Sequence, residues 1–289
     1  MSTIWQEIKI KMLHSGSRLG LLIGINIIVF LSINIPAVIE WLFSGHSLIS
    51  SYADEYLAMP PYLPKLEHRF WTPLTYMFMH AGILHIFFNM LWLYWMGQIF
   101  EEYLGNKRTI GLYLLGGLSG ALFFILGYNF LPVFSPSIAL SPPIVGASAA
   151  VMAIIIATAT LLPDYAINIM FIGPVKLKWL AIFYVIIDFI LIAGANPGGE
   201  MSHLGGALFG FIYIKQLQRG NDWIGAITGI FRKKSKMRVV SRNSDRNTSG
   251  KPRQDEIDRI LDKITDSGYE SLSKQEKEIL SRASKDNEV

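Results

Sequence analysis

The feature that most restricts the fold is a run of 55 residues, from Thr109 to Pro163, without a single Asp, Glu, Lys or Arg. A soluble globular domain carries about 25% charged residues, so an uncharged run of this length is not expected in one. The charges gather instead in residues 232–289, which hold 15 of the 26 basic and 11 of the 22 acidic residues. This division predicts a polytopic membrane protein followed by a polar tail.

The composition also excludes several classes of function. Without cysteine, the chain has no disulfide framework, no thiolate metal site and no cysteine nucleophile. The net charge of +4 lies entirely in the tail, directly after the last apolar segment. Basic residues there indicate membrane topology, so we expect no nucleic-acid partner. The first apolar run is long enough to span and lacks a small-residue cleavage site, so we expect a retained helix rather than a signal peptide.

Six apolar segments approach the roughly 20 residues that a spanning helix needs. They are Leu19–Ile39, His80–Phe100, Thr109–Phe130, Ser148–Leu162, Trp179–Ala193 and Met201–Leu217. If the N-terminus is cytoplasmic, nine of the eleven Lys and Arg residues before the tail fall inside, and only Lys65 and Arg69 fall outside. We therefore expect a multi-pass membrane protein with both termini on the cytoplasmic side.

This topology divides the chain into four parts. Residues 1–18 form a cytoplasmic N-terminal segment, 19–220 the membrane domain, 221–252 an interfacial and basic juxtamembrane linker, and 253–289 a cytoplasmic helical tail. Within the membrane domain, Glu40–Thr75 is predicted to be a long external loop.

The fourth apolar segment is too short to span. Its 15 residues cover roughly 22 Å as a helix, against a hydrocarbon core of roughly 30 Å. Pro163 and Asp164 fix its cytoplasmic end, and the preceding run from Ser135 to Gly146 contains three prolines. Irregular backbone at membrane depth is tolerated only inside protein or beside a water-filled cavity. We therefore expect Gly146, Ala147 and Ser148 at the floor of such a cavity.

Ser148 and His203 are the two candidates for chemistry in this region. Ser148 could be an N-cap or a nucleophile, and the two roles are compatible, because free N–H groups at a helix start can bind a developing oxyanion. His203 lies inside an apolar segment, where an ionisable residue indicates a function, although a neutral histidine bonded between helices is the alternative.

Small residues provide a way to bring these two side chains together. Gly206 and Gly210 share a helix face with His203, and Ala149, Ala153 and Ala157 form a matching strip beside Ser148. Small residues four apart let two helices approach closely, which would place a base within reach of the serine.

His80, His85 and Asn89 lie in the second apolar segment. His85 and Asn89 are four residues apart, so they share a face and could offer two donors to an oxyanion. Interhelical hydrogen bonding and a metal site are the alternatives. The spacing of five between His80 and His85 and the lack of a His-Glu-x-x-His motif disfavour a zinc protease.

Two acidic residues need separate interpretation. Asp188 is the one carboxylate well inside an apolar segment, which disfavours a paired-aspartate protease. It could orient His203, cap an interior hydrogen bond or face the cavity. Its position near the middle of its segment, with His203 near the external end of the next, argues against the first role. Glu101 is interpreted as structural, accepting from backbone or from Arg108.

Together these motifs resemble the rhomboid intramembrane serine proteases over roughly Phe70 to Leu217. The resemblance rests on Gly146-Ala-Ser148, on His203 with Gly206 and Gly210, and on His80-x4-His85-x3-Asn89. It implies an all-α bundle of six transmembrane helices and an endopeptidase that cleaves transmembrane segments of other membrane proteins through an acyl-enzyme.

The same resemblance implies a role for each matching residue. Ser148 would be the nucleophile and His203 the general base of a dyad without an acidic third member. His85, Asn89 and the backbone N–H of Ser148 would form the oxyanion hole. The remaining matched residues, His80, Glu101, Gly146, Gly206 and Gly210, would support the fold, and neither cofactor nor metal is expected.

The polar tail carries its own patterns. Arg232–Arg238 is a basic cluster expected to contact anionic lipid headgroups, at about 1 kcal/mol for each basic residue. Ile257, Ile260, Leu261 and Ile264 follow the spacing of an amphipathic helix that Gly268 would end. Ser273 and Glu276 form a capping box that opens a second helix. The pair is either a weakly folded hairpin or a docking site for a partner or a second copy.

Two rival functions remain at the level of the sequence. A rhomboid-like protein could recognise membrane segments without cutting them. A small-solute transporter or channel would need polar residues through the bundle, but below Ser148 the segment holds Ala, Ile, Val, Met and Thr. The lack of an internal repeat also disfavours a transporter built from inverted repeats.

Overall fold

The computed structural model describes residues 17–169, 172–230 and 254–286. The chain divides into two compact units, Met1–Arg232 and Lys233–Val289. The predicted basic cluster Arg232–Arg238 and most of the predicted N-terminal segment 1–18 lie outside the described residues.

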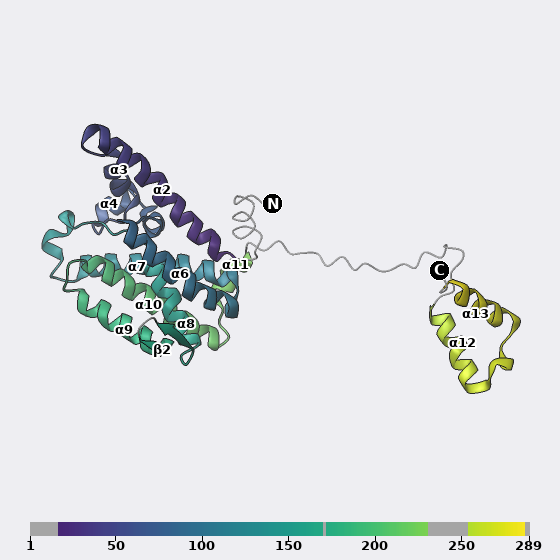
Figure 1. Ribbon diagram of the computed structural model, residues 1–289. Helices are drawn as coiled ribbons and strands as arrows, with labels where there is room; N and C mark the ends of the chain where they lie inside the picture. The colour runs from purple at the N-terminus through teal and green to yellow at the C-terminus, as the bar shows by residue number, and fades with distance from the viewer. Residues whose placement is uncertain (1–16, 170–171, 231–253, 287–289) are drawn as a thin grey trace. The chain divides into compact units, whose positions relative to one another are not determined.

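The longer helices of the first unit correspond one to one with the six apolar segments (Figure 1). They are α2 (Leu19–Ser44), α6 (Ile83–Leu104), α7 (Asn106–Phe130), α8 (Ser148–Leu161), α9 (Leu177–Leu191) and α10 (Pro197–Gln218). Three of them, α2, α6 and α7, are long and apolar enough to cross a membrane, and α8 is a shorter apolar helix. The first unit is therefore an α-helical membrane domain with at least three candidate spans.

Helix α8 forms the centre of this unit. Every residue from Ala149 to Ala159 is buried, and the helix contacts α6, α7, α9 and α10. A helix that is apolar on all sides is stable only when it is surrounded by other elements. The absence of charge that marked this segment in the sequence is thus explained by its central position.

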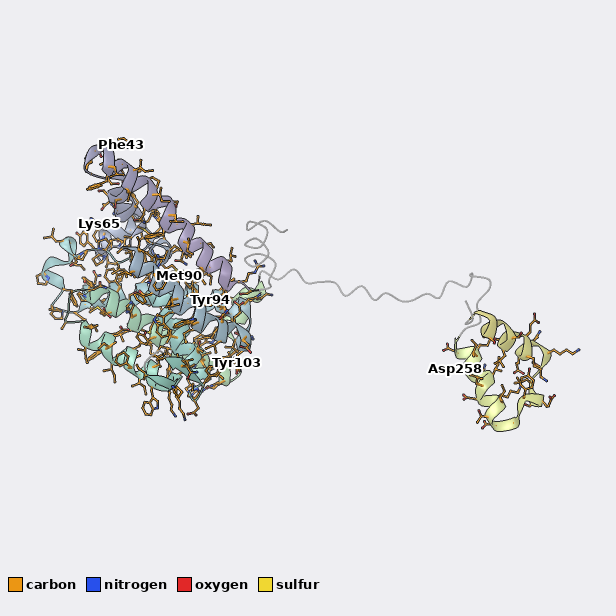
Figure 2. The ribbon with its side chains drawn as sticks, in the orientation of Figure 1. Phe43, Lys65, Met90, Tyr94, Tyr103 and Asp258 are labelled. Carbon is orange, nitrogen blue, oxygen red and sulfur yellow. The ribbon has the colours of Figure 1, made fainter. Side chains whose placement is uncertain are left out.

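The predicted external loop is largely helical. Helix α2 continues to Ser44 and ends at Gly45, whose φ of 74° is typical of a helix C-terminus. Short helices follow: α3 (Leu48–Leu57), α4 (Leu63–Glu67), α5 (Thr72–Thr75) and the 3₁₀ turn η2 (Tyr76–Phe78). Figure 2 shows Phe43 at the far end of α2, where 88% of its surface is exposed.

Two side-chain contacts fold this segment back on itself. Arg69 bonds to the carboxylate of Glu55, and this hydrogen bond holds the pKa of Glu55 below its usual range. The indole N–H of Trp71 donates to the carbonyl of Tyr56 at 2.8 Å. The segment is therefore an ordered cap of the unit rather than a free linker.

One element departs from the all-α expectation. Strands β1 (Ala166–Ile169) and β2 (Gly173–Lys176) pair antiparallel between α8 and α9, with Ala166 opposite Lys176. Four-residue strands carry too little alternation to be recognised in a sequence. Lys178 and Lys176 bond to Asp164 at 2.8 and 3.0 Å, which lowers the pKa of Asp164.

After α10 the chain turns into α11 (Trp223–Ile230). Asp222 accepts hydrogen bonds from Arg108 at 2.7 Å and from the hydroxyl of Tyr213 at 3.1 Å. Although burial raises the pKa of Asp222, the contact with Arg108 and the N–H of Gly225 outweigh it, and the pKa is lowered. The start of α11 is thereby fixed to α7 and α10.

The second unit is a helical hairpin of α12 (Gln254–Ser267), the turn η4 (Tyr269–Ser271) and α13 (Lys274–Asp286). The predicted capping box is confirmed. The N–H of Glu276 donates to Oγ of Ser273 at 3.3 Å, and the N–H of Ser273 donates to Oε2 of Glu276 at 2.8 Å. Gly268 follows the first helix with φ of 78°, as its predicted role requires.

Candidate active site

The site depends on the close approach of α8 and α10. A Cβ atom added to Gly206 would lie 2.0 Å from the carbonyl oxygen of Ala149, and one added to Gly210 would lie 2.2 Å from that of Ala153. The predicted packing of the two small-residue strips is therefore confirmed. Because the backbones touch there, the start of α8 lies beside the first half of α10, which carries His203.

A cavity of about 620 Å³ opens on the side of α8 that faces α6 and α9. Ser148 lines it, in agreement with the predicted position of this residue beside a cavity. The other polar residues of the lining are His85, Asn89, Tyr184, Asp188, Asn196 and His203. Residues that are far apart in the sequence thus meet in one hollow.

Ser148 is the first residue of α8 and not its N-cap. The N-cap position is occupied by Ala147, and no side chain caps this helix. The N-cap interpretation of Ser148 was therefore wrong. The backbone N–H of a first helical residue has no partner within its own helix, so it belongs to the groups that a ligand can use.

Gly146 brings the ring of His85 against the start of α8. Its φ is 135°, and a Cβ there would lie 2.9 Å from Nε2 of His85 and 3.4 Å from Oγ of Ser148. A side chain at Gly146 would displace one of these two groups. The positive φ and the close contacts explain why glycine occupies this position.

The hydrogen bonds of α6 orient the two candidate donors. The N–H of Ala81 donates to Nδ1 of His85 at 3.4 Å, which leaves Nε2 as the protonated nitrogen of a neutral ring. The amide nitrogen of Asn89 donates to the carbonyl of His85 at 2.9 Å and keeps a second N–H. Both side chains face the cavity, as the spacing of four predicted.

His203 makes contacts that the sequence did not predict. Its Nδ1 lies 3.3 Å from Oδ1 of Asp188 and 3.4 Å from Oε2 of Glu200. The argument from depth was wrong, because α9 ends at Leu191 and Asp188 lies in its last turn, next to the start of α10. Sequence reasoning missed Glu200, although its place one turn before His203 on the same helix was a usable signal.

His80 and Glu101 are the two supporting residues whose surroundings only the structure defines. His80 is buried, with its ring centre 5.2 Å from that of His85, and neither of its ring nitrogens has a hydrogen-bond partner in the described part of the chain. Glu101 does not accept from Arg108, because Arg108 donates to Asp222 and to the carbonyl of Leu104. Of the two partners considered for Glu101, backbone and Arg108, the second was therefore wrong.

Comparison with known proteins agrees with this geometry. Residues 67–219 match the Rhomboid domain family, and residues 243–286 match DUF6576, a family of unknown function. Since the first match covers more than half of the chain, this protein belongs to the rhomboid family.

A curated relative gives the same assignment. The chain is 31% identical to the RHOMBOID-like protein 12, mitochondrial, of Arabidopsis thaliana over 160 residues, which are 53% of this chain. The matched region covers 48% of the relative, so the chain spans about half the length of that protein.

Chemically, the cavity combines a hydroxyl, an imidazole and several hydrogen-bond donors. A serine beside a histidine is the pair that nucleophilic hydrolysis needs. Side-chain and backbone N–H groups nearby are the donors that stabilise a developing oxyanion.

Proposed function

We propose that this protein is an intramembrane serine endopeptidase that cleaves transmembrane segments of other membrane proteins. Ser148 attacks the scissile carbonyl, and His203 accepts its proton and later delivers it to the leaving amine. His85, Asn89 and the N–H of Ser148 stabilise the tetrahedral oxyanion, while His80, Glu101 and the glycines Gly146, Gly206 and Gly210 support the site. No cofactor takes part.

One observation carries this proposal: the cavity beside α8 is lined by Ser148, His203, His85 and Asn89 together. These residues come from three helices, and the contact of α10 with the backbone of α8 holds two of the helices at a fixed separation. Catalytic groups are most effective on rigid elements, because a displacement of about 1 Å can cost a factor of about 10² in rate.

The proposal extends to the membrane. Helices α2, α6, α7, α9 and α10 cross the bilayer, while α8 starts inside the membrane and ends at the cytoplasmic side. Both termini lie on the cytoplasmic side, residues 19–220 form the membrane domain, and the basic cluster in the linker 221–252 contacts anionic headgroups. The protein resides in a cytoplasmic membrane of the bacterial kind, and residues 253–289 form its cytoplasmic tail. The Arabidopsis relative is named as a mitochondrial protein, and our proposal for this chain differs from that location.

The direct test uses the purified protein in detergent with a fluorophosphonate that reacts with activated serines. We expect covalent labelling of the wild type at Ser148, identified by peptide mass, and no labelling of Ser148→Ala or His203→Ala. An unlabelled wild type, with the fold intact and a repeat in proteoliposomes also negative, would contradict the proposal. The non-cutting binder would then be favoured.

A further inference from the structure

The carboxyl groups of Asp188 and Glu200 meet at one nitrogen of the His203 ring. Oδ1 of Asp188 and Oε2 of Glu200 lie 3.3 and 3.4 Å from Nδ1, and the ligand atoms of all three side chains lie within 4.8 Å of one another. The acids come from different helices, α9 and α10, so the contact is produced by tertiary packing.

Placing two carboxyl groups at this position inside the membrane domain costs free energy. Asp188 is buried, and its Oδ2 has no hydrogen-bond partner among the described residues. In the same residues, His203 is the one basic side chain that forms an ion pair with either acid. Ionisable groups inside a membrane domain cost free energy and are retained mainly where they have a function.

The geometry points to Asp188 and Glu200 as positioning residues that hold the general base His203, an inference that rests on the proposed endopeptidase function. Nδ1–H donates to Oδ1 of Asp188, and the carboxylate of Glu200 lies 3.4 Å from the same nitrogen, which favours the tautomer with an unprotonated Nε2. Nε2 takes the proton of Ser148 as the bond from Oγ to the carbonyl carbon forms, and it returns that proton to the amine when the peptide bond breaks. The acids stabilise the imidazolium between these steps.

The test uses full-length protein in detergent and measures fluorophosphonate labelling over a range of probe concentrations. Asp188→Asn and Glu200→Gln each lower the maximal labelling rate about 10-fold, because one carboxylate remains, and the double variant lowers it about 10³-fold. The half-saturating probe concentration stays unchanged, since neither acid touches the probe. Asp188→Glu retains most of the rate.

A matched control separates this effect from a general loss of acidic charge. Asp164→Asn removes an exposed carboxylate that pairs with Lys176 and Lys178 and follows the end of α8 opposite to Ser148, so this variant should label at the wild-type rate. A double variant that labels as fast as the wild type would overturn the inference and leave the proposed function standing.

A second readout does not depend on activity. Nitrogen NMR of histidine-labelled protein, with His203→Ala to assign the signal, should show the Nδ1-protonated tautomer in the wild type and its loss in the double variant. If the wild type is not labelled by the probe, the proposed function fails, and an unchanged tautomer in the double variant then overturns the inference as well.

The same three donors suit Zn²⁺, which would occupy Nδ1 in place of a proton. If Nδ1 of His203 carries a proton, as the positioning role requires, labelling of Ser148 should be unaffected by EDTA. Loss of labelling with EDTA and its recovery with Zn²⁺ would make the cluster a metal site and overturn the positioning role.

Discussion

The two flanks of α8 are built in opposite ways. Towards α7 and α10 the helix has almost no side-chain layer: a Cβ on Gly116 would lie 2.3 Å from Cβ of Ala153, and one on Gly206 would lie 2.0 Å from a backbone oxygen. Towards α6 and α9 it borders a cavity of about 620 Å³ that contains the ionisable residues. The contact with α7 and α10 fixes the position of α8, and the side towards α6 and α9 leaves space for polar side chains.

This contrast between the two sides of α8 shows how a membrane domain can hold a polar site. Apolar side chains gain little by moving from lipid to protein, so helices associate through close van der Waals contact between small residues. That contact leaves no freedom on one side of α8. The facing helices on the other side, α6 and α9, meet through larger groups, such as the rings of Trp92 and Tyr184 with centres 5.5 Å apart.

The largest effect on stability and labelling is expected from disrupting the packed flank, the close contact of Gly206 and Gly210 in α10 with Ala149 and Ala153 in α8. Gly206→Ser places a side chain against the carbonyl oxygen of Ala149, and backbone atoms cannot rotate away. We expect a loss of about 3 kcal/mol in the free energy of unfolding and at least a 10²-fold slower labelling of Ser148. Denaturant titration in detergent and the labelling assay measure the two quantities.

The same substitution at Gly82 is the matched control. Gly82 precedes α6 with an extended backbone, and a Cβ there meets no atom within 4 Å. Serine is also favoured at this N-cap position, so Gly82→Ser should be at least as stable as the wild type. Equal losses at Gly206 and Gly82 would show that the packed flank is not special.

A smaller effect on stability is expected from a substitution on the side of α8 that borders the cavity. Asn89→Ala removes one proposed oxyanion donor, so catalysis should fall about 10²-fold, while the free energy of unfolding changes by about 1 kcal/mol. The comparison is with Asn34→Ala, which removes a similar bond from an asparagine to the carbonyl four residues earlier in α2. An Asn89 variant that loses stability but keeps its rate would place this residue in the packing instead.

The smallest effect concerns the tail, where polar contacts replace close packing. The N–H of Ser273, Lys263 and the hydroxyl of Ser273 lower the pKa of Glu276 from 4.5 to about 2. A lowered pKa means that the carboxylate stabilises α13 fully above about pH 4.5 and loses this effect as the pH falls towards 2. Hydrogen exchange of residues 274–286 should therefore accelerate on acidification.

Glu276→Gln should show the faster exchange already at pH 7 and should respond less to acid. Glu270→Gln, at a carboxylate with 94% of its side chain exposed, is the control and should change exchange much less. Labelling of Ser148 should be the same in both variants. A pH response of the tail that persists in Glu276→Gln would assign it to another group.

Sequence patterns alone predicted the six apolar helices, the capping box of the tail and the matching strips of Gly206, Gly210, Ala149 and Ala153. These features depend on spacing within one segment, which helix periodicity turns directly into a shared face. Ser148 beside a cavity also followed from local facts, namely the short length of its segment and the prolines before it.

The contacts between polar groups of different segments depend on tertiary packing. Asp188 and Glu200 reach the same nitrogen of His203 because α9 ends at Leu191 and α10 begins at Pro197, two and four residues earlier than the predicted Ala193 and Met201. Arg108 pairs with Asp222 rather than Glu101 because α11 folds back on α7. A shift of one turn moves a side chain by about 5.4 Å, more than the length of a hydrogen bond. The pattern of apolar residues predicts the ends of helices only to within about one turn. It therefore could not predict which polar side chains pair.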